Sequence, residues 1–348
     1  MLPFSPISTR WAKLTPKLTQ ARQSCLVHVP QPFSRQRRLL LVGIGAAVVT
    51  ACSDHSQTLS LDPQSTATKP IQHAYGETQV PINPIRVVVL GFFTLEAMMA
   101  LSVEPIAAPG MIFNNFLHLP SPDRELVDIG NPREPSLEQI AALQPDLILS
   151  TKGFTDSDTY ALLSQAAPTV VFDIEGYTDW QLLTRQCGEV LGKAAEIEQI
   201  EANYAAKLQA FRAQLPGGAD QIKVSVVSFY PGRISAFGKE TFTGTVLAAA
   251  GLSRPPQQAD TEIVQVSLER LSDIDGDVLF VLRPQSQTKE AGDVRAALDN
   301  IKDHPLWAKL EVVQAQRVYE VDAHWVGAGY IAANLILDDL LKYGVGSQ

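Results

Sequence analysis

The chain has 348 residues, of which 45% are hydrophobic and 19% are charged, a composition that excludes an intrinsically disordered protein. Residues 1–51 contain seven of the 28 Lys and Arg residues and no Asp or Glu, so residues 52–348 carry 21 basic and 37 acidic side chains, a formal charge of −16. This negative charge argues against a nucleic-acid partner, because a protein needs a basic surface to displace the counterions of a nucleic acid.

The N-terminal segment has the features of an export signal. Arg35, Arg37 and Arg38 precede an apolar run over residues 39–49, which is too short to span a bilayer comfortably but suits a signal peptide. The run ends in Val49-Thr50-Ala51-Cys52, which resembles the bacterial lipobox, where the Cys is acylated and cleavage falls just before it. We therefore expect residues 1–51 to be a lipoprotein signal peptide with an extended N-terminus, Cys52 to be lipidated, and the protein to be periplasmic or otherwise extracytoplasmic and membrane-anchored. The alternative is a short membrane anchor or a buried helix with a chance Cys.

The segment after Cys52 is polar at first and rich in Pro, Ser and Thr, so residues 52–84 are predicted to be a flexible tether and lead-in. Cys25 and Cys52 lie in the leader region, which leaves Cys187 alone in the folded part. This count excludes an intramolecular disulfide or a thiolate metal site there, and Cys187 is predicted to be a small buried hydrophobe.

From residue 86 onward, short β-branched runs alternate with segments of helical periodicity. This alternation predicts βαβ units and a parallel sheet covered on both faces. The expected strands are residues 86–90, 147–150, 169–172, 223–229, 277–282 and 317–321, and the expected helices are residues 95–101, 137–143, 159–166, 245–250 and 294–301.

The stretch from residue 178 to 215 shows helical periodicity without a strand signal, and it stops at Pro216-Gly217-Gly218. A helix of about 20 residues after Lys193 would be about 30 Å long. The sequence therefore predicts an α/β lobe over residues 85–177, a connecting helical segment over residues 178–216 and a second α/β lobe over residues 217–348.

The two predicted lobes share a repeat with an offset of 131 residues. Ser136-Leu137-Glu138 recurs as Ser267-Leu268-Glu269, and ten residues after each Ser an Asp, Asp146 or Asp277, opens an apolar strand. We interpret the repeat as two related lobes with a cleft between them, where ligands commonly bind.

These residues together resemble the periplasmic solute-binding proteins that serve iron–siderophore, haem and cobalamin ABC importers. The pattern is most similar to the ferric-siderophore branch, of the hydroxamate or citrate type. The resemblance is carried by Tyr75-Gly76-Glu77, residues 86–90 with Leu95-Glu96, Ile129-Gly130, residues 135–138, residues 144–148, residues 167–170, residues 267–269, Trp307, and residues 317–322.

The resemblance implies two Rossmann-like lobes joined by a long rigid helix (the class III binding-protein fold) and little closure on binding. It also implies capture of a ferric siderophore in the cleft, delivery to an ABC-transporter permease for iron uptake, no cofactor and no catalytic residues. We expect a monomer.

Glu138 and Glu269 match the family's glutamates that pair with permease arginines, and two anions spaced across the lobes suit docking. The alternative is that each glutamate only stabilises the start of a helix, with Ser136 and Gln139 forming a capping box.

Candidate ligand contacts follow the predicted strands, whose carboxyl ends face the cleft. Guanidinium and ammonium groups suit the oxygen atoms of a siderophore, and aromatic rings suit its apolar parts. The predicted ligand-binding residues are Arg133, Lys152, Arg233, Arg283, Trp325, Tyr230 and Phe92. The alternative is that the cations are solvated surface residues and that the rings belong to the core; Trp180 and Trp307 are assigned to packing.

Four other functions fit the sequence less well. A direct metal-ion binder needs three or four convergent ligands, yet the five histidines after Cys52 show no ligand spacing, and no metal site is predicted. Haem is possible, with His118 or Tyr230 as axial ligand, and so is cobalamin. An exported α/β enzyme lacks support, because the sequence contains no nucleophile elbow and no phosphate-binding loop, and we expect no enzyme.

Overall fold

The computed structural model describes residues 67–113, 118–120, 123, 125–215, 221–283 and 289–346. All of them belong to one compact unit, Leu61–Gln348. The predicted signal peptide, Cys52 and the first part of the predicted tether lie outside the described residues. Within the described ranges no helix combines the length and the apolar character needed to cross a membrane.

The N-terminal lobe is built on a five-stranded sheet of order β5-β4-β3-β8-β9, in which every pair is parallel. Successive residues of β3 contribute to two different apolar clusters, Val87 and Val89 to one and Val88 to the other, so the sheet is buried on both faces. This confirms the predicted architecture of the lobe. Its strands are β3 (Val87–Val89), β4 (Ala107–Ala108), β5 (Val127–Asp128), β8 (Leu147–Thr151) and β9 (Thr169–Phe172), and its helices are α1 (Phe92–Ala100), α2 (Gly110–Phe113), α3 (Leu137–Ala142) and α4 (Ser157–Leu163).

The C-terminal lobe has a mixed sheet of order β12-β11-β10-β13-β14. Strands β10, β13 and β14 are parallel, as predicted, but β11 and β12 pair antiparallel beside β10. The prediction of a wholly parallel sheet is wrong here, because the two-residue turn at Pro231-Gly232 leaves no room for a crossover helix. The strands are β10 (Val224–Tyr230), β11 (Arg233–Phe237), β12 (Ile263–Val266), β13 (Val278–Leu282) and β14 (Val318–Val321).

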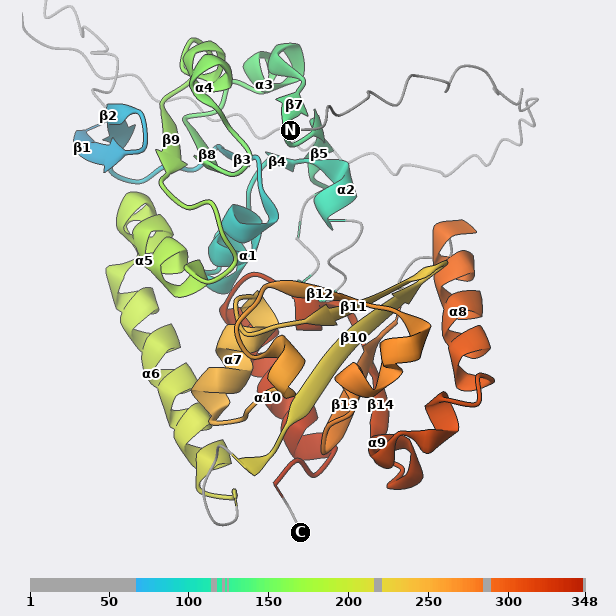
Figure 1. Cartoon of the computed structure of the whole chain (residues 1–348). Helices are drawn as coiled ribbons and strands as arrows, with labels where there is room; N and C mark the ends of the chain where they lie inside the picture. Colours follow the sequence, from blue (N-terminus) through green and yellow to red (C-terminus); the bar gives the residue numbers. More distant parts are fainter. Residues whose placement is uncertain are drawn as a thin grey trace, which may run out of the picture. The chain divides into compact units, whose positions relative to one another are not determined.

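Helices cover both faces of this second sheet. One face packs on α7 and α10 together with the connecting helix, and the other packs on α8 and α9 (Figure 1). The helices are α7 (Phe242–Ala250), α8 (Lys289–Lys302), α9 (Glu311–Gln314) and α10 (Tyr330–Lys342), with 3₁₀ turns η2 (Pro256–Gln258), η3 (Leu268–Ile274), η4 (Trp307–Lys309) and η5 (Ala323–Val326).

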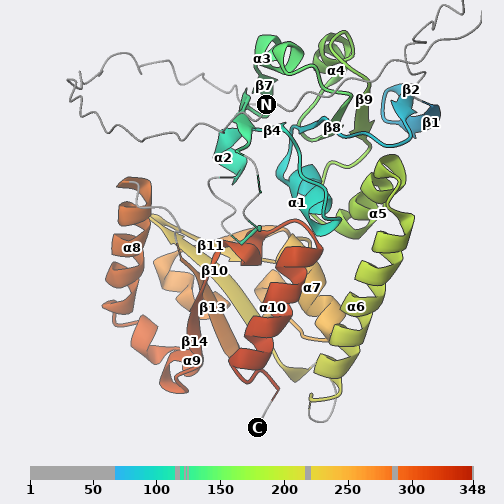
Figure 2. The ribbon, with the colours of Figure 1, turned by 180° about the vertical axis from the view of Figure 1, so that it is seen from behind.

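The connecting segment consists of α5 (Trp180–Leu191) and α6 (Ala194–Arg212), which run beside both lobes in Figures 1 and 2. Gly192 ends α5 in the left-handed region, with φ of 70°, a conformation that favours glycine. The 19 residues of α6 correspond to about 29 Å, close to the predicted length. Side chains of this segment belong to the cores of both lobes, so it is part of each lobe rather than a linker between them.

The sequence repeat corresponds to a structural repeat. The Asp146 carboxylate accepts hydrogen bonds from the backbone N–H groups of Ile85 (2.8 Å) and Arg86 (2.9 Å), just before β3. In the other lobe Asp277 accepts one from the N–H of Lys223 (2.6 Å), just before β10. Each aspartate therefore fastens the start of its own strand to the start of the neighbouring parallel strand.

Part of the predicted tether is ordered. Strands β1 (Thr68–His73) and β2 (Gly76–Pro81) form a hairpin against β9, where the N–H of Ala74 donates to the carbonyl of Val171 at 2.9 Å. The prediction of a flexible lead-in over residues 52–84 is therefore wrong for this hairpin. Only Val80 of its two strands is buried, so burial imposed little apolar pattern on the sequence. Cys187 is fully buried, as predicted, and burial raises the pKa of its thiol.

Candidate ligand-binding site between the lobes

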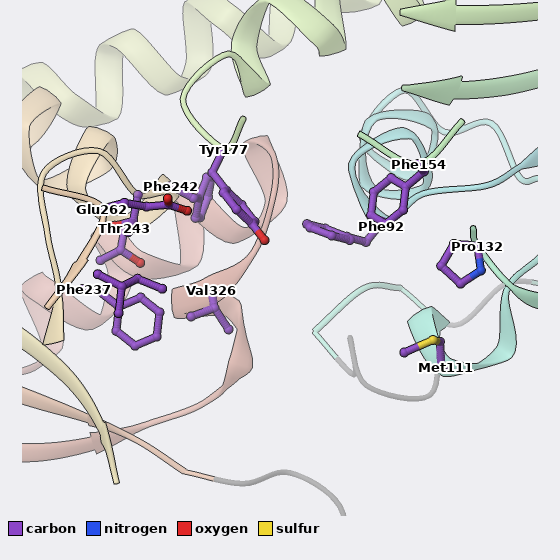
Figure 3. Close-up of a pocket in the computed structure, with 12 residues that line it drawn as sticks. Phe92, Met111, Pro132, Phe154, Tyr177, Phe237, Phe242, Thr243, Glu262 and Val326 are labelled. Carbon is purple, nitrogen blue, oxygen red and sulfur yellow. The ribbon is translucent and has the colours of Figure 1, made fainter. Parts of the chain in front are cut away.

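A cavity of about 360 Å³ lies between the two lobes (Figure 3). That volume is typical of sites for small organic ligands. Residues of both lobes line it, and most of them are apolar or aromatic. They are Phe92, Met111, Pro132, Phe154 and Tyr177 from the N-terminal half, and Phe237, Thr241, Phe242, Thr243, Glu262, Ile263 and Val326 from the C-terminal half.

Aromatic rings form the side of the cavity that belongs to the N-terminal lobe. Phe92 begins α1 directly after β3, and Phe154 follows β8, so both rings come from the carboxyl ends of parallel strands. Their centroids are 5.7 Å apart in an edge-to-face arrangement, and Tyr177 stacks 6.1 Å from Phe92. A Cβ atom at Gly91 would lie 2.9 Å from the Phe154 ring, so a glycine is required for this close approach.

The opposite side of the cavity comes from β11, the start of α7 and the end of η5. Thr241 caps α7, since its hydroxyl accepts a hydrogen bond from the N–H of Gly244 at 3.1 Å. This cap fixes the position of Phe242, which is 2% exposed and lies edge-to-face 5.5 Å from Trp180. Figure 3 shows Phe237, Thr243 and Val326 on this side, facing Phe92 and Phe154 across the cavity.

The predicted cations do not converge on the cavity. Arg133 lies beside it, with its guanidinium 5.7 Å from the centre of the Phe154 ring. Lys152 is bound by Asp173 (3.1 Å) and Glu175 (3.2 Å), whose hydrogen bonds raise the pKa of its ammonium group.

The two other predicted cations have partners of their own. Arg283 pairs with Asp322 at 2.5 Å, and it is not among the described lining residues. Arg233 stacks on Tyr230 at 4.4 Å, at the β10–β11 turn.

The predicted aromatic contacts have three different outcomes. Phe92 lines the cavity. Tyr230 is 38% exposed but lines a second hollow, on the C-terminal lobe. The prediction for Trp325 is wrong, because this side chain is 0% exposed: its ring lies 4.2 Å from that of Phe280 and its indole N–H donates to Asp339 at 2.9 Å. A core position with a satisfied N–H leaves Trp325 no surface to offer a ligand.

The second hollow, of about 530 Å³, lies on the C-terminal lobe between the β10–β11 turn, the start of η3 and α8. Tyr230, Arg233 and Glu269 are among its lining residues. The Ser267 hydroxyl beside Glu269 lowers the pKa of that carboxyl, so it is ionised at neutral pH.

Glu138 is exposed in the first turn of α3, at the position in the N-terminal lobe that corresponds to Glu269. The predicted capping box beside it is only half formed. Ser136 accepts from the N–H of Gln139 at 3.3 Å, whereas the N–H of Ser136 donates to the carbonyl of Ile129.

The proposed haem ligands do not line the interlobe cavity. His118 lies with its Nε2 atom 3.6 Å from a carboxylate oxygen of the buried Glu96, and Tyr230 lies in the other hollow. Among the residues that the structure describes, no group of three or more His, Cys, Asp or Glu could hold a metal ion.

Four aromatic residues of the cavity were not predicted as ligand contacts: Phe154, Tyr177, Phe237 and Phe242. Phe154 could have been predicted, because it lies two residues after Lys152, in the same segment that follows β8. Phe237 ends a strand that the sequence did not predict, and Tyr177 lies in an irregular segment, so neither carried a usable signal.

Two α/β lobes joined by a helical segment embedded in both, with a ligand-sized apolar cavity between them, define a two-lobed binding protein. Sequence comparison agrees with this class. The chain belongs to the periplasmic binding protein family, whose model matches residues 87–324.

Curated relatives match over most of their length. The chain is 28% identical over 310 residues to YfiY of Bacillus subtilis, described as a probable siderophore-binding lipoprotein, covering 85% of this chain and 94% of that protein. It is also 28% identical to the Fe(3+) dicitrate-binding periplasmic protein FecB of Escherichia coli, covering 78% of this chain and 89% of FecB.

Solved structures show the same fold. SirA of Staphylococcus aureus in complex with staphyloferrin B superposes with a TM-score of 0.65 at 26% identity, covering 79% of this chain and 98% of SirA. The iron-uptake system-binding protein FeuA of Bacillus subtilis gives a TM-score of 0.66 at 22% identity, covering 79% and 99% of the two chains. The predicted class III fold, with two lobes and a connecting helix, is confirmed.

Proposed function

We propose that this chain is an extracytoplasmic lipoprotein that captures a ferric siderophore between its lobes and delivers it to the permease of an ABC importer for iron uptake. The observation that carries the proposal is the aromatic cavity between the lobes. Relatives that match over most of their length are named for siderophore or ferric citrate binding. In this proposal the protein is a monomer and catalyses no reaction.

Fluorescence titration with ferric siderophores tests the capture step. Trp180 packs against Phe242, which lines the cavity, so a bound ferric complex should quench tryptophan emission. We expect saturable quenching by at least one ferric siderophore and about fivefold weaker binding by Tyr177→Ala, since one aromatic contact is worth about 1 kcal/mol. Leu182→Ala, an equally exposed position on α5 outside the cavity, should bind as the wild type does. Quenching by haem or cobalamin but by no ferric siderophore would assign another cargo.

The proposed docking residues are Glu138 and Glu269, one exposed carboxylate on each lobe. Charge reversal of both should abolish iron uptake and leave siderophore affinity unchanged, because neither residue lines the interlobe cavity. Glu198→Lys, at an exposed position of α6, is the matched control. Uptake at the wild-type rate by the doubly reversed protein would refute docking through these residues.

The proposed anchor is a lipid on Cys52. A tether to the membrane keeps the binding protein concentrated near its permease. Mass spectrometry of the membrane-extracted protein should show acylated Cys52 at the N-terminus, and Cys52→Ala should release the protein from the membrane. An unmodified chain that still begins at Met1 would contradict both the anchor and the signal peptide.

A further inference from the structure

The interlobe cavity has an unusual balance of charge for a site that would receive an anion. Among its described lining residues Glu262 is the single charged side chain, and none is a lysine or an arginine. Figure 3 shows Glu262 on the side of the cavity that belongs to the C-terminal lobe, with its carboxylate directed toward the cavity. Glu262 makes no ion pair with any described residue, so its charge is available to a ligand.

Of the predicted cations at the strand ends, only Arg133 offsets the negative charge of this carboxylate. Lys152 is held between two carboxylates, which leaves that group of three residues with a net negative charge, and Arg283 is neutralised by Asp322. Arg133 and Glu262 together carry no net charge. Residues 52–348, with these side chains included, carry a formal charge of −16, which repels an approaching anion.

The charge of a ferric siderophore depends on its chelating groups. Three hydroxamates, each with one negative charge, neutralise a ferric ion, whereas three catecholates, each with two, leave three negative charges on the complex. An apolar cavity replaces little of the hydration that such a trianion loses, and Glu262 would repel it. A neutral tris-hydroxamate complex meets neither cost, and a pendant ammonium group on it would donate a charge-assisted hydrogen bond to the carboxylate.

We infer that Glu262 sets the charge specificity of the site, so that the cargo is a ferric tris-hydroxamate complex of zero or single positive charge, with Glu262 accepting a ligand ammonium group. This inference rests on the proposed function and specifies its cargo. Phe92, Phe154 and Phe237 contact the apolar linkers of such a complex, and the guanidinium of Arg133 remains available for a hydroxamate oxygen.

The test compares three probes: ferrioxamine B, which carries a pendant ammonium group, its N-acetylated neutral derivative, and ferric enterobactin, a tris-catecholate. Wild-type protein should bind ferrioxamine B up to about fivefold more tightly than the acetylated form, because Glu262 is exposed and an exposed charge pair is worth up to about 1 kcal/mol. It should bind ferric enterobactin at least a hundredfold more weakly than ferrioxamine B. Glu262→Gln should remove the preference for the ammonium group by weakening ferrioxamine B and leaving the acetylated form unchanged, and it should strengthen the binding of ferric enterobactin, because the repulsive charge is gone.

Glu240→Gln is the matched control, because Glu240 is an exposed glutamate of the same lobe that is not among the described lining residues. It should leave all three affinities unchanged. Ferric enterobactin binding as tightly as ferrioxamine B, or an equal loss of both hydroxamate ligands in Glu262→Gln, would overturn the inference and leave the proposed function standing. Absence of binding by every ferric siderophore would overturn both.

Discussion

Replacing Glu96 by alanine should destabilise the protein by removing a contact that joins the two lobes. Glu96 lies on α1 in the N-terminal lobe and is 1% exposed. Its carboxylate accepts hydrogen bonds from the backbone N–H groups of Ala328 and Ala332, each at 2.8 Å, at the start of α10 in the C-terminal lobe. The residue that should cap α10 is Gly329, which has no side chain, so Glu96 supplies the cap from the other lobe.

The size of the effect follows from these contacts. Hydrogen bonds to a charged group contribute about 1.5–3 kcal/mol each, and both N–H groups would be left buried and unpaired. The negative charge at the N-terminus of α10 adds up to about 1 kcal/mol through the helix dipole. Glu96→Ala should therefore lower the free energy of unfolding by about 3–7 kcal/mol. Glu96→Gln keeps one good acceptor and should lose about half of that.

Urea unfolding, followed by circular dichroism and by tryptophan emission, measures this loss. Since Trp180 and Trp325 both belong to the core of the C-terminal lobe, the two signals should separate in the alanine variant as the lobes become less strongly coupled. Glu198→Ala, at an exposed position of α6, should change the stability by less than 0.5 kcal/mol, about the limit for surface substitutions. A loss below about 1 kcal/mol in Glu96→Ala, with coincident transitions, would refute the reasoning.

Two further substitutions test other parts of the fold. Trp325→Ala should cost about 3–5 kcal/mol in urea unfolding, as for other large core residues, whereas a ligand contact would lose affinity without losing stability. Asp146→Ala should be more destabilising than Asp277→Ala by about 1 kcal/mol. The reason is that Asp146 accepts two backbone hydrogen bonds, whereas Asp277, at the equivalent position of the other lobe, accepts one. Equal urea midpoints for the two variants would contradict this ranking.

Most of the strands that the sequence predicted share one physical property. Five of the six, β3, β8, β9, β10 and β13, are buried over all or nearly all of their residues and therefore read as apolar runs such as Val87–Val89 or Val278–Leu282. The exception is β14, in which one residue of four is buried. The missed strands are edge strands, hairpins or very short. In β12 (Ile263–Val266) three of the four residues are not buried, so burial imposed little pattern on the sequence.

The site was harder to predict than the fold. The sequence places cations at strand ends, but it does not show which acids lie beside them, and Asp173, Glu175 and Asp322 neutralise two of the predicted contacts. Asp173 and Glu175 follow β9, the neighbour of β8, and Asp322 follows β14, the neighbour of β13. The order of the strands in each sheet therefore decides which acid lies beside which cation.

The sequence by itself determined the family resemblance, the two-lobed α/β fold and the long helix between the lobes, because burial and helical periodicity leave local patterns. It also placed Glu138 and Glu269 at equivalent positions of the two lobes, through a repeat that the structure reproduces at Asp146 and Asp277. Only the tertiary structure decided the composition of the cavity. Its residues come from several strand ends and two lobes, and their convergence depends on how the lobes pack against α5 and α6, a long-range arrangement that no local pattern encodes.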